Sequence, residues 1–255
     1  MYADRKIFML LTNTETQVTI RRRLGACISA FLLCALLGFC VYPSSAFADV
    51  RQSDVIAGLS VEARDLSASS CPNIVAEYAY VVDDSGNVYF ERGADTQTHI
   101  ASITKVMTAL IALEYGDVNT TTITVSETAA TIGDTMNLQT ALMAMMLPSG
   151  NDAAQAIAES MGDSVKQQLQ EQGDTSVPDN AYDAFVYAMN KKAQELGMNN
   201  SLFANPHGLD IDQHDAEMYC SAHDVAIMVS KVMKNDTFRS IVSMDGATIQ
   251  VNRGG

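Results

Sequence analysis

Two short motifs in this chain place residue types that could carry out acyl transfer. Ser102 and Lys105 stand three residues apart at the start of an apolar run, and Ser149 and Asn151 stand two apart after another. A serine hydroxyl is a weak nucleophile until a neighbouring group accepts its proton. A lysine amine accepts that proton only when neutral, so its pKa must be lowered by burial or by nearby cations. We therefore regard Ser102 as a candidate nucleophile and Lys105 as its candidate base.

The spacing of the first motif suits this chemistry if the segment is helical. Positions i and i+3 of a helix share one face, with Cβ atoms about 5–6 Å apart. The pattern over 102–115 predicts a helix that ends at Gly116, with apolar residues at Ile103, Val106, Met107, Leu110 and Ile111. This stripe could bury Lys105, and the N–H groups at the helix start could stabilise an oxyanion. On spacing alone, the pattern favours a surface lysine whose ammonium reaches water.

The second motif lies where two predicted helices meet. Pro148-Ser149-Gly150 interrupts the helical pattern between residues 136–147 and 151–162. Ser149 could relay a proton to a leaving amine, and Asn151 could hold a substrate amide with both its donor and its acceptor. The alternative is an ordinary turn with an asparagine cap.

The remaining pattern predicts an α+β chain that is mainly helical. Residues 75–93 resemble a hairpin with a turn at 84–87, and 163–181 resemble a polar surface loop. The run of methionines at 143, 145 and 146 is expected to fill the core. Further elements are expected as a short strand or extended loop at 121–127, helices at 185–198 and 221–235 with Ser221 as N-cap, and a strand starting near 247. A sheet with this few strands is rarely stable on its own. The antiparallel sheet therefore looks incomplete at its C-terminal end.

The N-terminus has the layout of a secretory signal peptide. Three arginines at 21–23 precede an apolar segment at 24–41, and Ala46-Phe47-Ala48 follows as a small-residue cleavage site. We expect cleavage after Ala48 and export from the cytoplasm; an uncleaved membrane anchor is the alternative. The predicted organisation is an extension and signal at 1–48, a tether at 49–73 and one domain at 74–255.

The composition of the chain limits the classes of partner that it could bind. The 255-residue chain carries a formal net charge of −14, which argues against nucleic acid or an anionic membrane surface as a partner. Of its five cysteines, only Cys71 and Cys220 lie beyond residue 48. Export would permit a disulfide between them, but two cysteines so far apart do not establish one, and we expect separate thiols.

The histidines give weaker signals. A metal site could be proposed from five residues close in sequence: His207, Asp210, Asp212, His214 and Asp215. We interpret them instead as a polar surface loop after a turn. His99 and His223 have no acidic partner in an obvious position. We therefore expect neither a metal nor a Ser-His-Asp triad.

Taken together, Ser102-x-x-Lys105 and Ser149-x-Asn151 match the motifs of penicillin-binding proteins and class A β-lactamases. The flanking stretches ASITKVMTA, MLPSGNDAA, FANPHGLD and SAHDVAIMVSKV resemble those of the serine-type D-alanyl-D-alanine carboxypeptidases, the low-molecular-mass penicillin-binding proteins. The resemblance covers roughly residues 75–245. It implies a β-lactamase/DD-peptidase-like fold, with Ser102 as acyl-ester nucleophile, Lys105 as proton acceptor, Ser149 as third catalytic group and Asn151 as a substrate contact.

The same resemblance implies a reaction and its partners. Ser102 would attack the terminal D-Ala–D-Ala bond of peptidoglycan stem peptides outside the cytoplasmic membrane, release D-alanine, and be freed by hydrolysis of the acyl-enzyme. β-Lactams would acylate the same serine, and no metal or organic cofactor is implied. Membrane association stays open.

The chain departs from the family pattern at two places. It has no Lys-Thr-Gly motif, which in the family lies on a strand after the last residue present here, so we expect a truncated chain of doubtful activity. The segment from Ser126 to Met136 looks shorter than its equivalent in the family, so Ser102 and Ser149 lie closer together in sequence than is usual there. Two alternatives remain: a non-catalytic peptidoglycan- or penicillin-binding module, and a serine β-lactamase, a class that more often has Asp where this chain has Gly150.

Overall fold

The computed structural model describes residues 17–21, 50–67, 70–72, 74–125, 133–210 and 215–253. The predicted apolar segment at 24–41 and the cleavage site at 46–48 lie outside these residues. Of the predicted N-terminal extension and signal, residues 17–21 form strand β1 (Gln17–Arg21), which pairs antiparallel with β8 (Gly246–Gln250). Within the described ranges, no helix is both long enough and apolar enough to cross a membrane.

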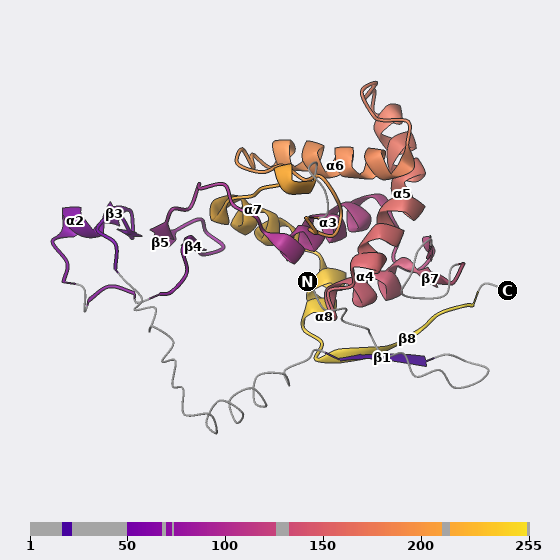
Figure 1. The fold of residues 1–255 in the computed structure, drawn as a ribbon, viewed down its shortest axis with the longest axis horizontal. Helices are drawn as coiled ribbons and strands as arrows, with labels where there is room; N and C mark the ends of the chain where they lie inside the picture. The colour runs from indigo at the N-terminus through magenta and orange to yellow at the C-terminus, as the bar shows by residue number, and fades with distance from the viewer. Residues whose placement is uncertain are drawn as a thin grey trace, which may run out of the picture.

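Helix α3 (Lys105–Tyr115) is the centre of the helical part of the molecule (Figure 1). Four helices pack around it: α4 (Leu138–Met146), α5 (Asn151–Glu171), α6 (Ala181–Glu195) and α7 (Ala222–Val232). The predicted stripe is buried at Met107, Leu110 and Ile111, whereas Ile103 is 44% exposed. The helix predicted over 102–115 is therefore confirmed, with its inward face set by apolar burial.

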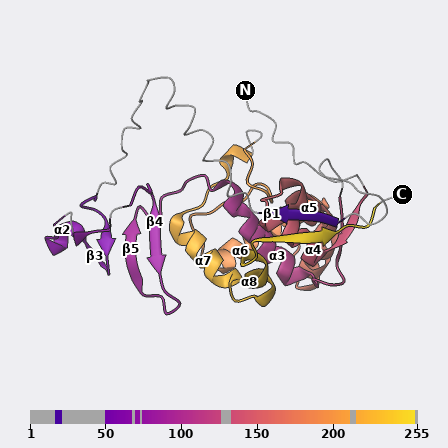
Figure 2. The same ribbon diagram turned by 90° about the horizontal axis from the view of Figure 1, so that it is seen from below.

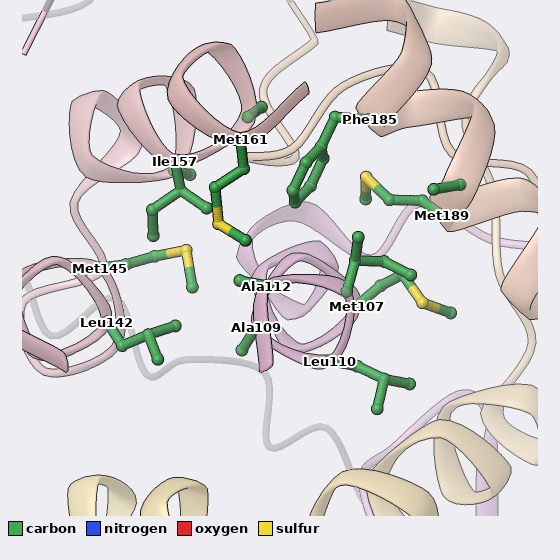
Figure 3. Close-up of a cluster of buried hydrophobic side chains, with 14 of the residues drawn as sticks. Met107, Ala109, Leu110, Ala112, Leu142, Met145, Ile157, Met161, Phe185 and Met189 are labelled. Carbon is green, nitrogen blue, oxygen red and sulfur yellow. The ribbon is translucent and has the colours of Figure 1, made fainter. Parts of the chain in front are cut away.

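The core surrounds α3 on its apolar side (Figure 3). Met145 of α4, Met161 of α5 and Phe185 of α6 converge on the small residue Ala112 and its neighbours. Of the three methionines expected in the core, Met145 is fully buried, and the other two are partly buried against the same cluster. Each large apolar side chain buried here stabilises the fold by roughly 1.5–3 kcal/mol.

A four-stranded antiparallel sheet lies beside the helical body, in the order β3-β2-β5-β4 (Figure 2). The predicted hairpin is present as β4 (Ala79–Val82) and β5 (Val88–Arg92), and β4 packs against α7. Together with the helices, these strands confirm the predicted α+β class.

Part of the predicted tether belongs to this sheet instead. Residues 55–64 form β2 (Val55–Ile56), β3 (Leu59–Ser60) and α2 (Val61–Arg64). The physical reason is a buried ion pair: Arg92 Nη2 lies 2.6 Å from Asp54 Oδ2, and both side chains are at most 3% exposed. Because a buried charge is stable only when it is paired, Asp54 fixes the start of this segment on β5. The expectation of a tether is wrong for residues 55–64.

Helix α5 is longer than the sequence pattern indicated. It continues to Glu171, so the loop expected at 163–181 is restricted to 172–180. Val165 and Leu169 are buried, which extends the apolar face of the helix past the polar residues around them. Gly162 does not end the helix. It lies where α5 closely approaches the start of α6, since a Cβ there would lie 1.8 Å from the Ala181 carbonyl oxygen.

The remaining elements complete the helical side. The predicted Ser221 cap is confirmed: its Oγ accepts the Asp224 N–H at 3.1 Å. Helix α8 (Asp236–Val242) was not anticipated, whereas the strand expected near 247 is β8. The strand expected at 121–127 is β6 (Thr122–Thr124), paired with β7 (Thr135–Asn137); residues 126–132, in the segment that looked short, lie outside the described residues. Cys71 and Cys220 are separate thiols, as expected.

Candidate active site

The structure brings Ser102 and Lys105 into direct contact. Ser102 lies in a short 3-10 helix (Ala101–Thr104) that leads into α3, and Lys105 is the first residue of α3. In a 3-10 turn, residues i and i+3 lie directly above one another. Lys105 Nζ is accordingly 3.0 Å from Ser102 Oγ, within hydrogen-bond range. Ser102 is exposed, whereas Lys105 is only 1% exposed.

The environment of Lys105 favours its neutral form. Burial lowers the pKa of the amine to about 8, against a smaller opposing effect from the Asp152 carboxylate. This excludes the alternative of a surface lysine that reaches water. A buried amine whose pKa lies near neutrality can accept a proton, which an ordinary lysine cannot do efficiently.

Lys105 Nζ has two further partners besides Ser102. It donates to Asn151 Oδ1 and to the His207 carbonyl oxygen, each at 2.7 Å. Asn151 is the first residue of α5, so the break between α4 and α5 places its side chain beside the amine. Lys105 uses one of the two lone pairs of Asn151 Oδ1, so this contact leaves Asn151 with both a donor and an acceptor. The role of Asn151 as a substrate contact through both its donor and its acceptor stays a prediction.

Ser149 lies in the same break but makes no hydrogen bond within the described part of the chain. It is exposed and has a left-handed backbone, with φ of 63°. Such a conformation in a residue other than glycine costs about 1–2 kcal/mol and is held by its surroundings, because the next N–H, that of Gly150, bonds the Met145 carbonyl at 3.0 Å. The structure thus places Ser149 two residues from Asn151 without joining its hydroxyl to Ser102 or Lys105. Its catalytic role remains a prediction.

The turn that supplies the His207 carbonyl is buried, contrary to the expected surface loop. His207 is 8% exposed and Asn205 only 1%. Burial lowers the pKa of His207; Asp215 opposes this effect and Lys105 adds to it. His207 Nδ1 accepts the Leu209 N–H at 3.1 Å, which assigns a neutral ring protonated on Nε2. The sequence indicated a turn here but not its part in the site, because the group that the turn contributes is a backbone oxygen.

Gly208 fixes the turn against the nucleophile segment. Its φ is +80°, and a Cβ built on it would lie 1.9 Å from the Ala101 carbonyl oxygen. Ala101, next to Ser102, itself has a left-handed φ of 44°. The backbone on which Ser102 is mounted and the turn that holds Lys105 are therefore in van der Waals contact.

Other candidate groups lie elsewhere. In the described part of the chain, no group of three or more His, Cys, Asp or Glu side chains could hold a metal ion, and residues 212 and 214, two of the five considered as a metal site, fall outside it. His223 does have an acidic partner, since its Nδ1 is 3.0 Å from Asp95 Oδ1, but both side chains are exposed and neither bonds Ser102.

Comparison with known proteins gives a consistent result. A family model described as D-alanyl-D-alanine carboxypeptidase matches residues 65–171 and 179–252. The chain is 32% identical over 176 residues to the D-alanyl-D-alanine carboxypeptidase DacF of Bacillus subtilis, covering 64% of this chain and 39% of DacF. It is 29% identical over 198 residues to DacA of Haemophilus influenzae, covering 71% and 45% respectively. The chain therefore spans less than half the length of these two relatives.

Solved structures show the same fold. A mutant of the Streptomyces K15 DD-transpeptidase superposes with a TM-score of 0.59 at 26% identity, covering 71% of this chain and 69% of that one. The D-alanyl-D-alanine carboxypeptidase DacD of Francisella tularensis superposes with a TM-score of 0.55, covering 70% and 44%. The predicted DD-peptidase-like α+β architecture is confirmed.

Proposed function

The chain belongs to the D-alanyl-D-alanine carboxypeptidase family, and from that membership we propose that it acts on D-Ala–D-Ala stem peptides of peptidoglycan through an acyl-enzyme on Ser102. The observation that carries this proposal is the buried Lys105 amine 3.0 Å from the Ser102 hydroxyl. The relatives named above are carboxypeptidases and a transpeptidase, all DD-peptidases by their names. The substrate lies outside the cytoplasmic membrane, so we also propose that the protein is exported.

The geometry supports the first chemical step. Neutral Lys105 takes the Ser102 proton as Oγ forms a bond to the carbonyl carbon of the penultimate D-alanine. The tetrahedral intermediate then expels the terminal D-alanine, whose amine receives the proton that Lys105 took from Ser102, and leaves an ester on Ser102. Water hydrolyses that ester and regenerates the hydroxyl. A β-lactam would follow the same path as far as the ester, with its ring amide in place of the peptide bond.

Covalent labelling tests the proposal. After incubation of the full chain with benzylpenicillin, intact-mass spectrometry is expected to show the addition of one penicilloyl group. The Ser102→Ala variant, folded by circular dichroism, is expected to show none. Release of D-alanine from a peptide ending in D-Ala-D-Ala then measures the carboxypeptidase step itself.

Other results would favour the alternatives. A folded chain without an adduct would be a non-catalytic peptidoglycan- or penicillin-binding module. Rapid hydrolysis of penicillin without a long-lived adduct would indicate a β-lactamase.

The pH dependence of acylation follows from the state of Lys105. Since the base must be neutral and its pKa is about 8, the acylation rate is expected to rise with pH and to level off above that value. Between about pH 7 and 9 the neutral fraction, and hence the rate, increases roughly tenfold. Stopped-flow acylation at a series of pH values measures this. A rate that keeps rising to about pH 10 would mean that the base has an ordinary lysine pKa, against the buried site described above.

A further inference from the structure

We propose that Asn205 is a positioning residue for the reactive amine: its carboxamide folds the turn at 205–209 so that the His207 carbonyl faces Lys105 Nζ. This inference rests on the proposed function, because it concerns how the base named there is held. Asn205 belongs to neither motif at the site and touches neither Ser102 nor Lys105.

The carboxamide of Asn205 uses both of its ends in this turn. Oδ1 accepts the backbone N–H groups of His207 at 3.2 Å and Gly208 at 2.7 Å. Nδ2 donates to the Leu209 carbonyl at 2.8 Å and to Asp215 Oδ1 at 2.7 Å. Among side chains of this size, only asparagine offers two donors and a two-fold acceptor, so the turn is built around this residue.

The turn is also fastened to α3. Thr108, one helical turn after Lys105, donates its hydroxyl proton to the Pro206 carbonyl at 2.6 Å. Gly208 abuts the Ala101 backbone on the other side. The His207 carbonyl between these two contacts has little freedom to move once Asn205 has set the backbone.

The orientation of the Lys105 lone pair depends on that carbonyl. A neutral amine carries two N–H donors and one lone pair in a tetrahedral arrangement. Asn151 Oδ1 and the His207 carbonyl oxygen, each at 2.7 Å, take the two donors. The lone pair then points to the remaining neighbour, Ser102 Oγ. Without the His207 acceptor, the amine can rotate and lose its alignment with the hydroxyl.

The test compares two asparagines in the full chain. Asn205→Ala is expected to lower the second-order rate of benzylpenicillin acylation roughly 10–100-fold, as a small displacement of an aligned group does. Asn190→Ala is the matched control. Asn190 also bonds backbone on both ends of its amide, to Val186 and Phe203, but among the described residues it forms no hydrogen bond with the 205–209 turn. Its variant is expected to lose stability and keep the acylation rate within about twofold.

A second pair of variants covers the case in which Asn205→Ala does not fold. Asn205→Asp keeps the acceptor for the His207 and Gly208 N–H groups but loses both Nδ2 donors, to the Leu209 carbonyl and to Asp215, so it is expected to acylate slowly. Adding Asp215→Asn restores the hydrogen bond to residue 215 with its direction reversed, but not the one to the Leu209 carbonyl, so acylation is expected to recover in part. Failure to recover would overturn the assignment to this hydrogen bond.

A readout without acylation separates this inference from the proposed function. In the full chain with 13C-labelled lysine, Lys105 is one of seven lysines and its Cε signal is assigned by Lys105→Met. Burial holds the pKa of Lys105 near 8 while Asp152 of α5 opposes, and the neutral His207 is the other titratable group nearby. An opened turn hydrates the amine, so Asn205→Ala is expected to move the titration upward and Asn190→Ala to leave it unchanged.

Each outcome bears on either the proposed function or the role of Asn205. If the wild type does not acylate, the proposed function fails, and the lysine titration alone decides the role of Asn205. If folded Asn205→Ala matches wild type in acylation and titration, the inference is overturned. Equal losses in Asn205→Ala and Asn190→Ala would also overturn it, because the effect would then be one of general stability.

Discussion

Replacing Lys105 with methionine is expected to lower the rate of Ser102 acylation about 10³-fold while leaving the protein folded. Methionine fills a similar volume but cannot accept a proton, so the general-base contribution, typically 10²–10⁴-fold, is lost. The side chain is 1% exposed and lies at the edge of the core. Removing a desolvated amine relieves an unfavourable burial, but it also leaves Asn151 Oδ1 and the His207 carbonyl without their donor, so only a small net change in the unfolding temperature is expected.

Benzylpenicillin acylation by stopped flow and thermal unfolding by circular dichroism measure the two effects together. Lys166→Met is a suitable control, because the Lys166 ammonium pairs with the exposed Asp179 and forms no hydrogen bond with Ser102 in the described part of the chain. It is expected to change neither quantity appreciably. An acylation rate in Lys105→Met within tenfold of wild type would show that another group takes the Ser102 proton. A fall in rate that parallels a fall in unfolding temperature would indicate a structural role instead.

The Ser102–Lys105 pair could be predicted from sequence because the interaction is local. A separation of three residues at a helix start leaves few geometries, and the apolar stripe after it indicates burial. The 3-10 turn at 101–104 tightens the spacing but does not change the prediction. The hairpin at 79–92 and the Ser221 cap were predictable for the same reason, since turn and capping chemistry is encoded within a few residues.

The rest of the site depends on contacts between distant segments. The His207 carbonyl reaches Lys105 across 102 residues of sequence, and a backbone oxygen has no signature in residue type. The Asp54–Arg92 pair, 38 residues apart, likewise joined a presumed tether to the sheet. Polar residues such as Asn205 looked like surface in the sequence because their buried partners are mostly main-chain atoms. The periodicity of apolar residues in the sequence indicates which faces of helices and strands are buried. It does not indicate a buried polar turn whose groups are satisfied by hydrogen bonds within the turn.

Glycine 208 offers the sharpest test of that buried turn. A Cβ at this position would lie 1.9 Å from the Ala101 carbonyl oxygen and 2.4 Å from its carbon, both backbone atoms that cannot rotate away. Gly208→Ala is therefore expected to cost about 3–5 kcal/mol in the free energy of unfolding, from left-handed strain of about 1–2 kcal/mol plus overpacking. If the turn shifts to relieve the clash, less stability is lost, but the His207 carbonyl moves and the acylation rate falls about 10²-fold.

Gly197→Ala separates the two parts of this cost. Gly197 has almost the same backbone conformation, with φ of +77° against +80°, but a Cβ there would meet nothing within 4 Å. Its variant is expected to show only the left-handed strain, about 1–2 kcal/mol, and an unchanged acylation rate. Denaturant unfolding and acylation of both variants measure the difference directly. If the two substitutions cost the same and both acylate normally, the 205–209 turn does not press on the nucleophile segment. A larger cost confined to Gly208→Ala means that the segment carrying Ser102 and the turn holding Lys105 are positioned by one shared contact.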